Sequence, residues 1–223
     1  MKKGLLSEAI IKYVLGLVVF AALLFIPAGT LRYPQAWLLI AILFLPMLVI
    51  GIYLYLRNPE LLQKRLNDKE SESEQKQVVI MSMLMFLAVF VIAGLHVRFG
   101  WYLLPFWVSC IAAVLFLAGY VMYAEVVREN EYLSRVVEVQ ASQKVIDTGL
   151  YGIVRHPMYA ATVILFLMMP LVLGCIVSFL IALLYLPIIN KRIRNEEVVL
   201  EQGLDGYSEY KKKVRYKVIP FVW

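Results

Sequence analysis

Cysteine, histidine and charged side chains are all scarce in this chain. Its two cysteines and two histidines are too few and too scattered for a disulfide framework or a metal-ligand cluster. Charged residues make up 17% of the 223 residues, against about 25% in a typical soluble domain. Hydrophobic residues make up 62%, which is more than one soluble core accommodates. A water-soluble enzyme, a disordered chain and a coiled coil are therefore excluded as first interpretations.

Long apolar runs take the place of a soluble pattern. A membrane-spanning helix needs about 20 apolar residues, and runs of this kind occupy residues 10–27, 35–56, 78–97 and 101–124. A further stretch, residues 158–189, is too long for one span and is interrupted by proline and glycine. We predict that it forms two short helices that turn near residues 173–175. The expected fold is all-α: a polytopic helical bundle of about six membrane helices with a cytoplasmic C-terminal segment.

The distribution of basic residues predicts the orientation. With six spans and a cytoplasmic N-terminus, only Arg32 and Arg98 fall in outer loops, which leaves 20 of the 22 Lys and Arg inside. Both termini are therefore expected in the cytoplasm, and the net charge of +6 indicates anionic lipid rather than nucleic acid. Residues 67–76 are predicted to be a polar linker. We divide the chain into an N-terminal four-helix region, 1–127, and a second region, 128–223.

Two polar segments are expected to meet at the cytoplasmic face, because the predicted hairpin joins residues 140–159 to residues 191–220. Pro157 suits the first position of a helix, and the residues before it then lie near a helix N-terminus that favours an anion. Tyr151 and Tyr159 offer flat faces for a ring. A simple membrane re-entry corner explains the same residues equally well.

Arg192 and Glu196 lie four residues apart, so they share one face if the preceding helix continues past the membrane. Arginine holds a carboxylate with two hydrogen bonds, and Glu196 is suited to an ammonium group or a ribose hydroxyl. From the spacing alone, an intrahelical salt bridge is the simpler interpretation.

Several short motifs follow one another in the second half of the chain: Gly149-Leu150-Tyr151, Arg155-His156-Pro157-Met158-Tyr159, Glu196-Glu197 with Leu200, then Tyr207, Tyr210 and Ile219-Pro220. In this order they resemble the isoprenylcysteine carboxyl methyltransferase family. This family belongs to a wider group of small membrane methyltransferases that includes phospholipid N-methyltransferases. The resemblance extends over about residues 130–220.

The resemblance implies that S-adenosylmethionine binds at the cytoplasmic face and leaves as S-adenosylhomocysteine. Carried over by position, the cofactor contacts are Gln140, Gln143, Lys144, Val145, Ile146, Tyr151, His156, Pro157, Met158, Tyr159 and Glu196. Gln140 matches with a different spacing. Arg192 takes the position expected to hold the substrate, and it forms the candidate catalytic pair with His156. No metal is expected, because the two histidines, His96 and His156, are too few and too isolated to form a metal cluster.

The chain departs from the family pattern at two places. Leu204-Asp205 stands where relatives commonly have Phe-Gly, and Lys217 stands where many have arginine. Lysine keeps the charge without the planar fork, so we do not expect Lys217 to contact the ligand.

The expected function is carboxyl O-methylation of a lipophilic, isoprenylcysteine-like acceptor, with membrane lipids as further partners and no nucleic acid. A carboxylate is already ionised near neutral pH and needs no strong base. An amine acceptor would need one, which His156 or a glutamate can supply, so lipid N-methylation stays open. A membrane reductase is a more distant alternative, because no glycine-rich dinucleotide motif is present. A transporter or assembly factor is a further alternative, although such transporters carry polar groups in mid-membrane.

Overall fold

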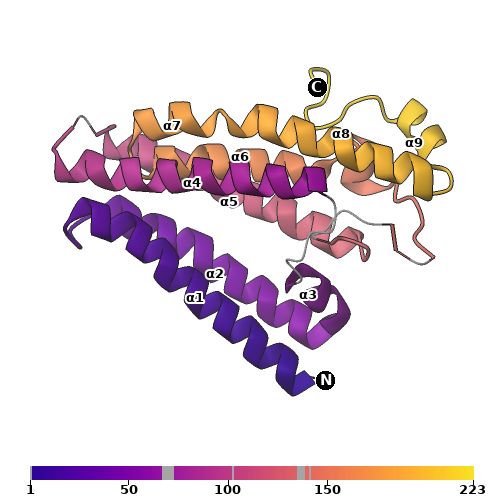
Figure 1. Cartoon of the computed structure of the whole chain (residues 1–223), viewed down its shortest axis with the longest axis horizontal. Helices are drawn as coiled ribbons and strands as arrows, with labels where there is room; N and C mark the ends of the chain where they lie inside the picture. The colour runs from indigo at the N-terminus through magenta and orange to yellow at the C-terminus, as the bar shows by residue number, and fades with distance from the viewer. Residues whose placement is uncertain (1, 67–72, 102, 135–138, 141) are drawn as a thin grey trace.

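The computed structural model describes residues 2–66, 73–101, 103–134, 139–140 and 142–223 (Figure 1). The regular structure in these residues is helical throughout. Its helices are α1 (Lys2–Ala28), α2 (Pro34–Arg57), α3 (Pro59–Leu66), α4 (Ser73–Arg98), α5 (Phe106–Glu129), a 3-10 turn (Gly149–Gly152), α6 (Pro157–Val172), α7 (Ile176–Ala182), α8 (Tyr185–Gly203) and α9 (Tyr207–Lys213). The predicted all-α bundle is confirmed.

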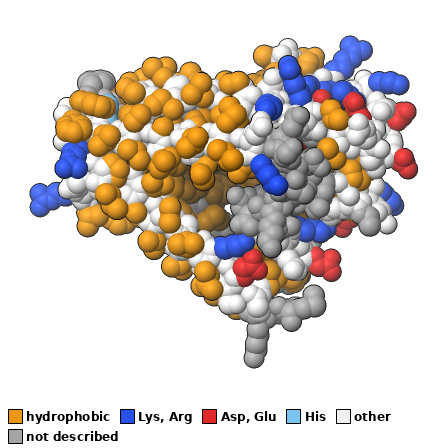
Figure 2. Space-filling model, in the orientation of Figure 1, with side chains coloured by type: hydrophobic (Ala, Val, Ile, Leu, Met, Phe, Trp, Pro, Cys, Tyr) orange, Lys and Arg blue, Asp and Glu red, His pale blue; other side chains and the backbone are white. Residues whose placement is uncertain are grey.

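Among the described residues, five helical stretches are long and apolar enough to cross a membrane: Gly4–Ala28, Pro34–Arg57, Lys76–Arg98, Phe106–Glu129 and Ile176–Gly203. The last of them combines α7 with α8. Helix α6 is apolar but only 16 residues long, and it packs along α5 and α7. Hydrophobic side chains cover most of the surface of these helices on the face shown in Figure 2, as expected for contact with lipid. The chain is a multi-pass membrane protein.

Small residues allow the helices to approach one another closely. A Cβ atom at Gly94 of α4 would lie 2.7 Å from the Leu24 carbonyl oxygen of α1. A Cβ atom at Gly119 of α5 would lie 3.1–3.3 Å from Ile164 and Leu165 of α6. Such close contacts are typical of membrane helices, which associate mainly through van der Waals packing and hydrogen bonds.

One end of the bundle, called the turn end here, contains residues 29–33, 103–105 and 173–175 (Figure 1). The hydroxyl of Tyr33 donates to the Leu173 carbonyl oxygen at 2.7 Å, and the Leu104 N–H donates to the Gly174 carbonyl oxygen at 2.9 Å. Gly174 has a φ of +74°, a conformation that favours glycine. The predicted hairpin between residues 158 and 189 therefore turns where expected.

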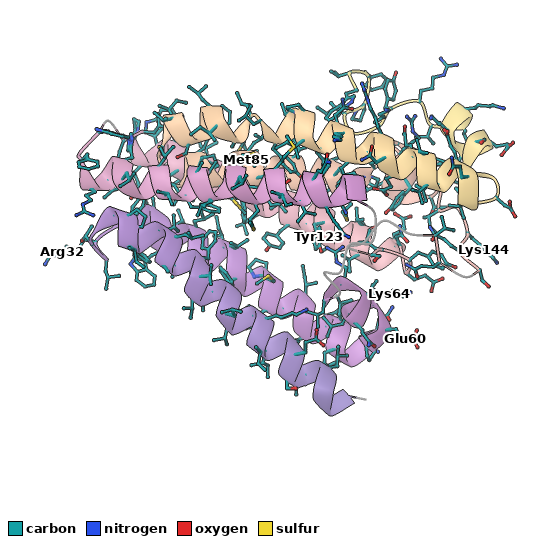
Figure 3. All side chains as sticks on the ribbon, viewed as in Figure 1. Arg32, Glu60, Lys64, Met85, Tyr123 and Lys144 are labelled. Atoms are coloured by element: carbon teal, nitrogen blue, oxygen red, sulfur yellow. The ribbon has the colours of Figure 1, made fainter. Side chains whose placement is uncertain are left out.

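Both termini lie towards the opposite end of the bundle (Figure 1), which agrees with an even number of passes. Arg32 at the turn end and Lys144 at the opposite end are well separated in Figure 3.

The second helix of the hairpin is longer than the predicted residue range. A break at Leu183 and Leu184 separates α7 from α8, because Pro187 has no N–H to donate to the Leu183 carbonyl oxygen. Helix α8 then continues to Gly203 and carries Arg192 and Glu196 on one face. The expected helical continuation is confirmed.

Three expectations need correction. The helix expected from residue 101 begins at Phe106. Leu104 precedes a proline, which disfavours the helical conformation, and its N–H donates to the Gly174 carbonyl oxygen in the hairpin turn. The predicted linker overlaps α4, which already begins at Ser73; residues 67–72 lie outside the described residues. Helices α3 and α9 were not expected. The proposed division after residue 127 falls within α5 and stays a prediction.

Candidate active site

A pocket lined by both polar and apolar side chains opens at the end of the bundle opposite the turn end, and we call this end the pocket end. The pocket lies between the C-terminal end of α5, the N-terminal end of α6, helix α8 and helix α9. It contains about 860 Å³ of empty space, a volume that includes the open solvent at its mouth.

Most residues expected to contact a ligand line this one pocket. They come from the loop before the 3-10 turn, from the start of α6 and from α8: Gln143, Lys144, Val145, Ile146, Tyr151, His156, Pro157, Met158, Tyr159, Arg192 and Glu196. Segments about 50 residues apart in the sequence therefore meet at a single site.

Gln140 is the exception, since it is not among the residues that line the pocket. Its side-chain amide donates to the Tyr132 carbonyl oxygen at 2.6 Å, and its backbone N–H donates to the Gln143 side-chain oxygen at 2.9 Å. Gln140 thus holds two pocket residues in position from behind.

The pocket also contains residues that the sequence analysis did not assign to it: Asn130, Tyr132, Leu133, Ser134, Arg155, Leu200, Leu204, Tyr207 and Tyr210. Four of them, Arg155, Leu200, Tyr207 and Tyr210, belong to the motifs quoted above, so the sequence contained a signal for them. Leu204 was noted only as a departure from the family pattern.

Arg192 and Glu196 are linked through Tyr159. The Tyr159 hydroxyl donates to the Glu196 carboxylate and accepts a hydrogen bond from Arg192 Nε at 3.0 Å. The ring of Tyr159 also stacks on that of His156, with centroids 5.6 Å apart. The four side chains therefore form one connected group in the pocket wall.

Glu197, next to Glu196, has a different environment. It is 4% exposed, and its Oε1 lies 2.8 Å from Arg155 Nε and 3.3 Å from His156 Nε2. Its Oε2 lies 3.3 Å from Lys217 Nζ. A buried carboxylate with several cationic partners is expensive to leave unpaired. Glu197 thus organises the structure behind the pocket.

The C-terminal segment is held against the start of α6. The N–H groups of Arg155 and His156 donate to the carbonyl oxygens of Tyr216 and Lys217 at 2.9 and 2.8 Å. The guanidinium of Arg155 donates to the Val214 carbonyl oxygen at 2.7 Å. Lys217 does not line the pocket, as its chemistry led us to expect.

The first helical position of α6 is Pro157, as predicted, and His156 is its N-cap. The free N–H groups of this first turn favour an anion at the pocket wall.

Tyr151, in the 3-10 turn, also lines the pocket. Its hydroxyl accepts a hydrogen bond from the Asn130 side chain at 2.8 Å, and its carbonyl oxygen accepts one from the Tyr210 hydroxyl at 2.7 Å. Burial raises the pKa of Tyr151, so this phenol is neutral near pH 7. Its ring is a flat, uncharged surface in the pocket.

Helix α3 reaches the edge of the pocket. Arg65 donates to the Tyr123 hydroxyl and lies 3.8 Å from the Met158 sulfur, which lines the pocket. The N-terminal region is therefore in contact with the site.

The fold and the pocket together define a class: a multi-pass helical membrane protein with an open pocket, lined by polar and apolar side chains, at one end of its bundle. The comparisons with known proteins narrow this class. Residues 110–202 match the model of the isoprenylcysteine carboxyl methyltransferase family. The matched region contains the start of α6, the hairpin and both glutamates of α8.

A solved structure of the eukaryotic intramembrane Ras methyltransferase, isoprenylcysteine carboxyl methyltransferase, has a similar fold. The two chains are 16% identical with a TM-score of 0.51, over 97% of this chain and 86% of the other. No curated protein sequence matches the chain significantly. Residues 110–202 are therefore similar to the isoprenylcysteine carboxyl methyltransferase family, and the whole chain shares the fold of that solved structure.

Proposed function

We propose that this protein transfers a methyl group from S-adenosylmethionine to the carboxylate of a lipophilic, isoprenylcysteine-like acceptor. The observation that carries the proposal is the connected group of Arg192, Tyr159 and Glu196 in a pocket that also contains the start of α6. This group offers a guanidinium and a carboxylate on one helix face, about one turn apart. The similarity of residues 110–202 to the isoprenylcysteine carboxyl methyltransferase family supports the same function.

The residues of the pocket fit S-adenosylmethionine. Glu196 provides a carboxylate for the ammonium group, and the first turn of α6 provides N–H groups for the carboxylate. Tyr151 and Ile146 provide apolar surface for the adenine ring. Bound S-adenosylmethionine would supply a methyl group on a positively charged sulfur.

Arg192 is suited to hold the carboxylate of the acceptor. Its Nε already donates a hydrogen bond to the Tyr159 hydroxyl, which orients the guanidinium plane. The acceptor carboxylate is ionised near neutral pH, so alignment of the reacting atoms and exclusion of water are the main tasks of the protein. His156, held near Glu197, fixes the wall beside Tyr159.

The pocket end is proposed to face the cytoplasm. The basis is the predicted division of Lys and Arg, in which only Arg32 and Arg98 lie on the other side. An acceptor anchored in the inner leaflet would then reach the pocket from the membrane, and anionic lipid would lie near the basic residues.

Methyl transfer to a defined acceptor tests the proposal. Purified protein would be supplied with methyl-labelled S-adenosylmethionine and either a farnesylated thiol acid or a lipid amine. We expect label in a base-labile product from the acid, because methyl esters hydrolyse in base. Label only in a base-stable product from the amine would replace the proposal with lipid N-methylation. Label in neither product would contradict both.

A further inference from the structure

One hydroxyl in the pocket wall has no hydrogen-bond partner among the described residues. Tyr207 lines the pocket and is 4% exposed, and its hydroxyl oxygen is buried without a partner. Such groups are rare in native proteins and indicate an absent ligand or water. Tyr207 lies outside the matched residues 110–202, so the family match assigns it no role.

The neighbouring tyrosine of α9 behaves differently. Tyr210 is also buried, and its hydroxyl donates to the Tyr151 carbonyl oxygen at 2.7 Å. The two rings pack with centroids 5.8 Å apart. Tyr210 therefore anchors α9 to the pocket by a hydrogen bond, whereas the Tyr207 hydroxyl makes no such contribution.

The Tyr207 hydroxyl is suited to donate. Burial raises the pKa of Tyr207, and the negative charges of Glu197 and Glu196 raise it further, so the phenol keeps its proton. The nearby carboxylates already have donors: Glu197 has Arg155, and Glu196 has Tyr159. The hydroxyl is thus a neutral donor without an acceptor among the described residues, on a side chain that lines the same pocket as Glu196.

We propose that the Tyr207 hydroxyl donates a hydrogen bond to the carboxylate at the amino-acid end of the bound methyl donor. This inference rests on the function proposed above, with Glu196 as the partner of the ammonium group. In an amino acid the carboxylate and the ammonium are attached to the same carbon atom. Because Tyr207 lines the same pocket as Glu196, we place its hydroxyl at this end of the ligand, with the adenine against Tyr151 and Ile146 as proposed above.

Calorimetry on the full-length protein in detergent tests the inference with two ligands. S-Adenosylhomocysteine contains the amino-acid end, and 5′-methylthioadenosine lacks it. We expect Tyr207→Phe to lower the affinity for S-adenosylhomocysteine about tenfold or more. The affinity for 5′-methylthioadenosine should not change. The melting temperature of the variant without ligand should stay equal or rise, because an unpaired buried hydroxyl has been removed.

Tyr210→Phe is the matched control. It removes a hydrogen bond that exists without ligand, so its melting temperature should fall. A Tyr207→Phe variant that binds S-adenosylhomocysteine as tightly as the wild type would overturn the inference. An equal loss for both ligands would overturn it as well.

Two further results keep the test decisive. If Tyr207→Phe does not fold, the wild type is titrated with S-adenosylhomocysteine and with its decarboxylated analogue. Equal affinities would then contradict recognition of the carboxylate. A wild-type protein that binds none of these adenosine ligands would instead contradict the proposed function itself.

Discussion

The two ends of the helical bundle are held together by different interactions. At the turn end, neutral groups donate to main-chain carbonyl oxygens, as Tyr33 does to Leu173. At the pocket end, the buried carboxylate of Glu197 gathers Arg155, His156 and Lys217. Neutral hydrogen bonds suffice to close a turn, whereas burying charges is costly. The charges around Glu197 therefore depend on one another, because each of them can be buried only while its partners remain in place.

The same contrast separates two adjacent glutamates. Glu196 lines the pocket beside Tyr159, whereas Glu197 lies behind the pocket among cations. We expect a substitution at Glu196 to affect the ligand and one at Glu197 to affect the fold. The following predictions test both contrasts.

Glu197→Gln should give the largest effect, a loss of about 3–5 kcal/mol in the free energy of unfolding. The amide leaves Arg155 buried without a counter-charge. Thermal unfolding in detergent measures the loss. Glu201→Gln is the control, because Glu201 is exposed and pairs with Lys211 at the surface. Equal melting temperatures for the two variants would show that the buried network is not needed for stability.

Arg192→Lys should lower turnover about 100-fold, because lysine loses the planar fork that aligns the acceptor carboxylate. Affinity for S-adenosylhomocysteine should stay close to that of the wild type. Initial rates on a farnesylated thiol acid, with calorimetry on the same preparation, provide both values. Arg194→Lys, an exposed position on the same helix, is the control. Wild-type turnover in Arg192→Lys would remove Arg192 from the site.

Glu196→Gln should weaken the binding of S-adenosylhomocysteine by about 1.5–3 kcal/mol, because a charge-assisted contact with the ammonium group is lost. The melting temperature without ligand should fall much less than in Glu197→Gln. Calorimetry measures the affinity of both variants for S-adenosylhomocysteine, and thermal unfolding measures their melting temperatures. A stronger loss of affinity in folded Glu197→Gln would mean that the roles of the two glutamates are reversed.

Tyr33→Phe should lower the free energy of unfolding by about 1 kcal/mol, because the bond to the Leu173 carbonyl oxygen is lost. Since Tyr33 lies at the turn end, affinity for S-adenosylhomocysteine should not change. Thermal unfolding and calorimetry measure the two effects. A loss of affinity would show that the two ends are coupled.

Single cysteines at Lys3 and Lys213 should be protected from an impermeant thiol reagent in intact cells, and one at Arg32 should be labelled. The background would be Cys110→Ser and Cys175→Ser, which removes the native thiols. Labelling of either terminus would contradict the predicted orientation and leave the fold unaffected.

The sequence predicted the long helices well, because a run of about 20 apolar residues has one stable form in a membrane. It missed α3 and α9, which are eight and seven residues long and contain few apolar positions. Such short helices are stabilised by contacts with the rest of the molecule. In α3, for example, Leu61 belongs to a buried cluster that also contains Tyr151, and Leu66 packs against the same cluster together with Tyr55 of α2.

The site was predictable where a motif names its residues, as with His156 and Glu196. The roles of Arg155 and Tyr207 depend on tertiary structure. Arg155 is buried against a segment about 60 residues later, and Tyr207 enters the pocket because the chain turns at Gly206, with a φ of +83°. Both residues belong to the quoted motifs, but no spacing in the sequence indicates which groups they contact.

Equilibrium binding of S-adenosylmethionine to the purified wild-type protein tests the central claim most directly. We expect one site per chain by calorimetry, with competition by S-adenosylhomocysteine and a clear loss in Glu196→Gln. Binding that is unchanged in Glu196→Gln would move the cofactor away from the proposed position. The absence of binding by folded wild-type protein would contradict the account as a whole.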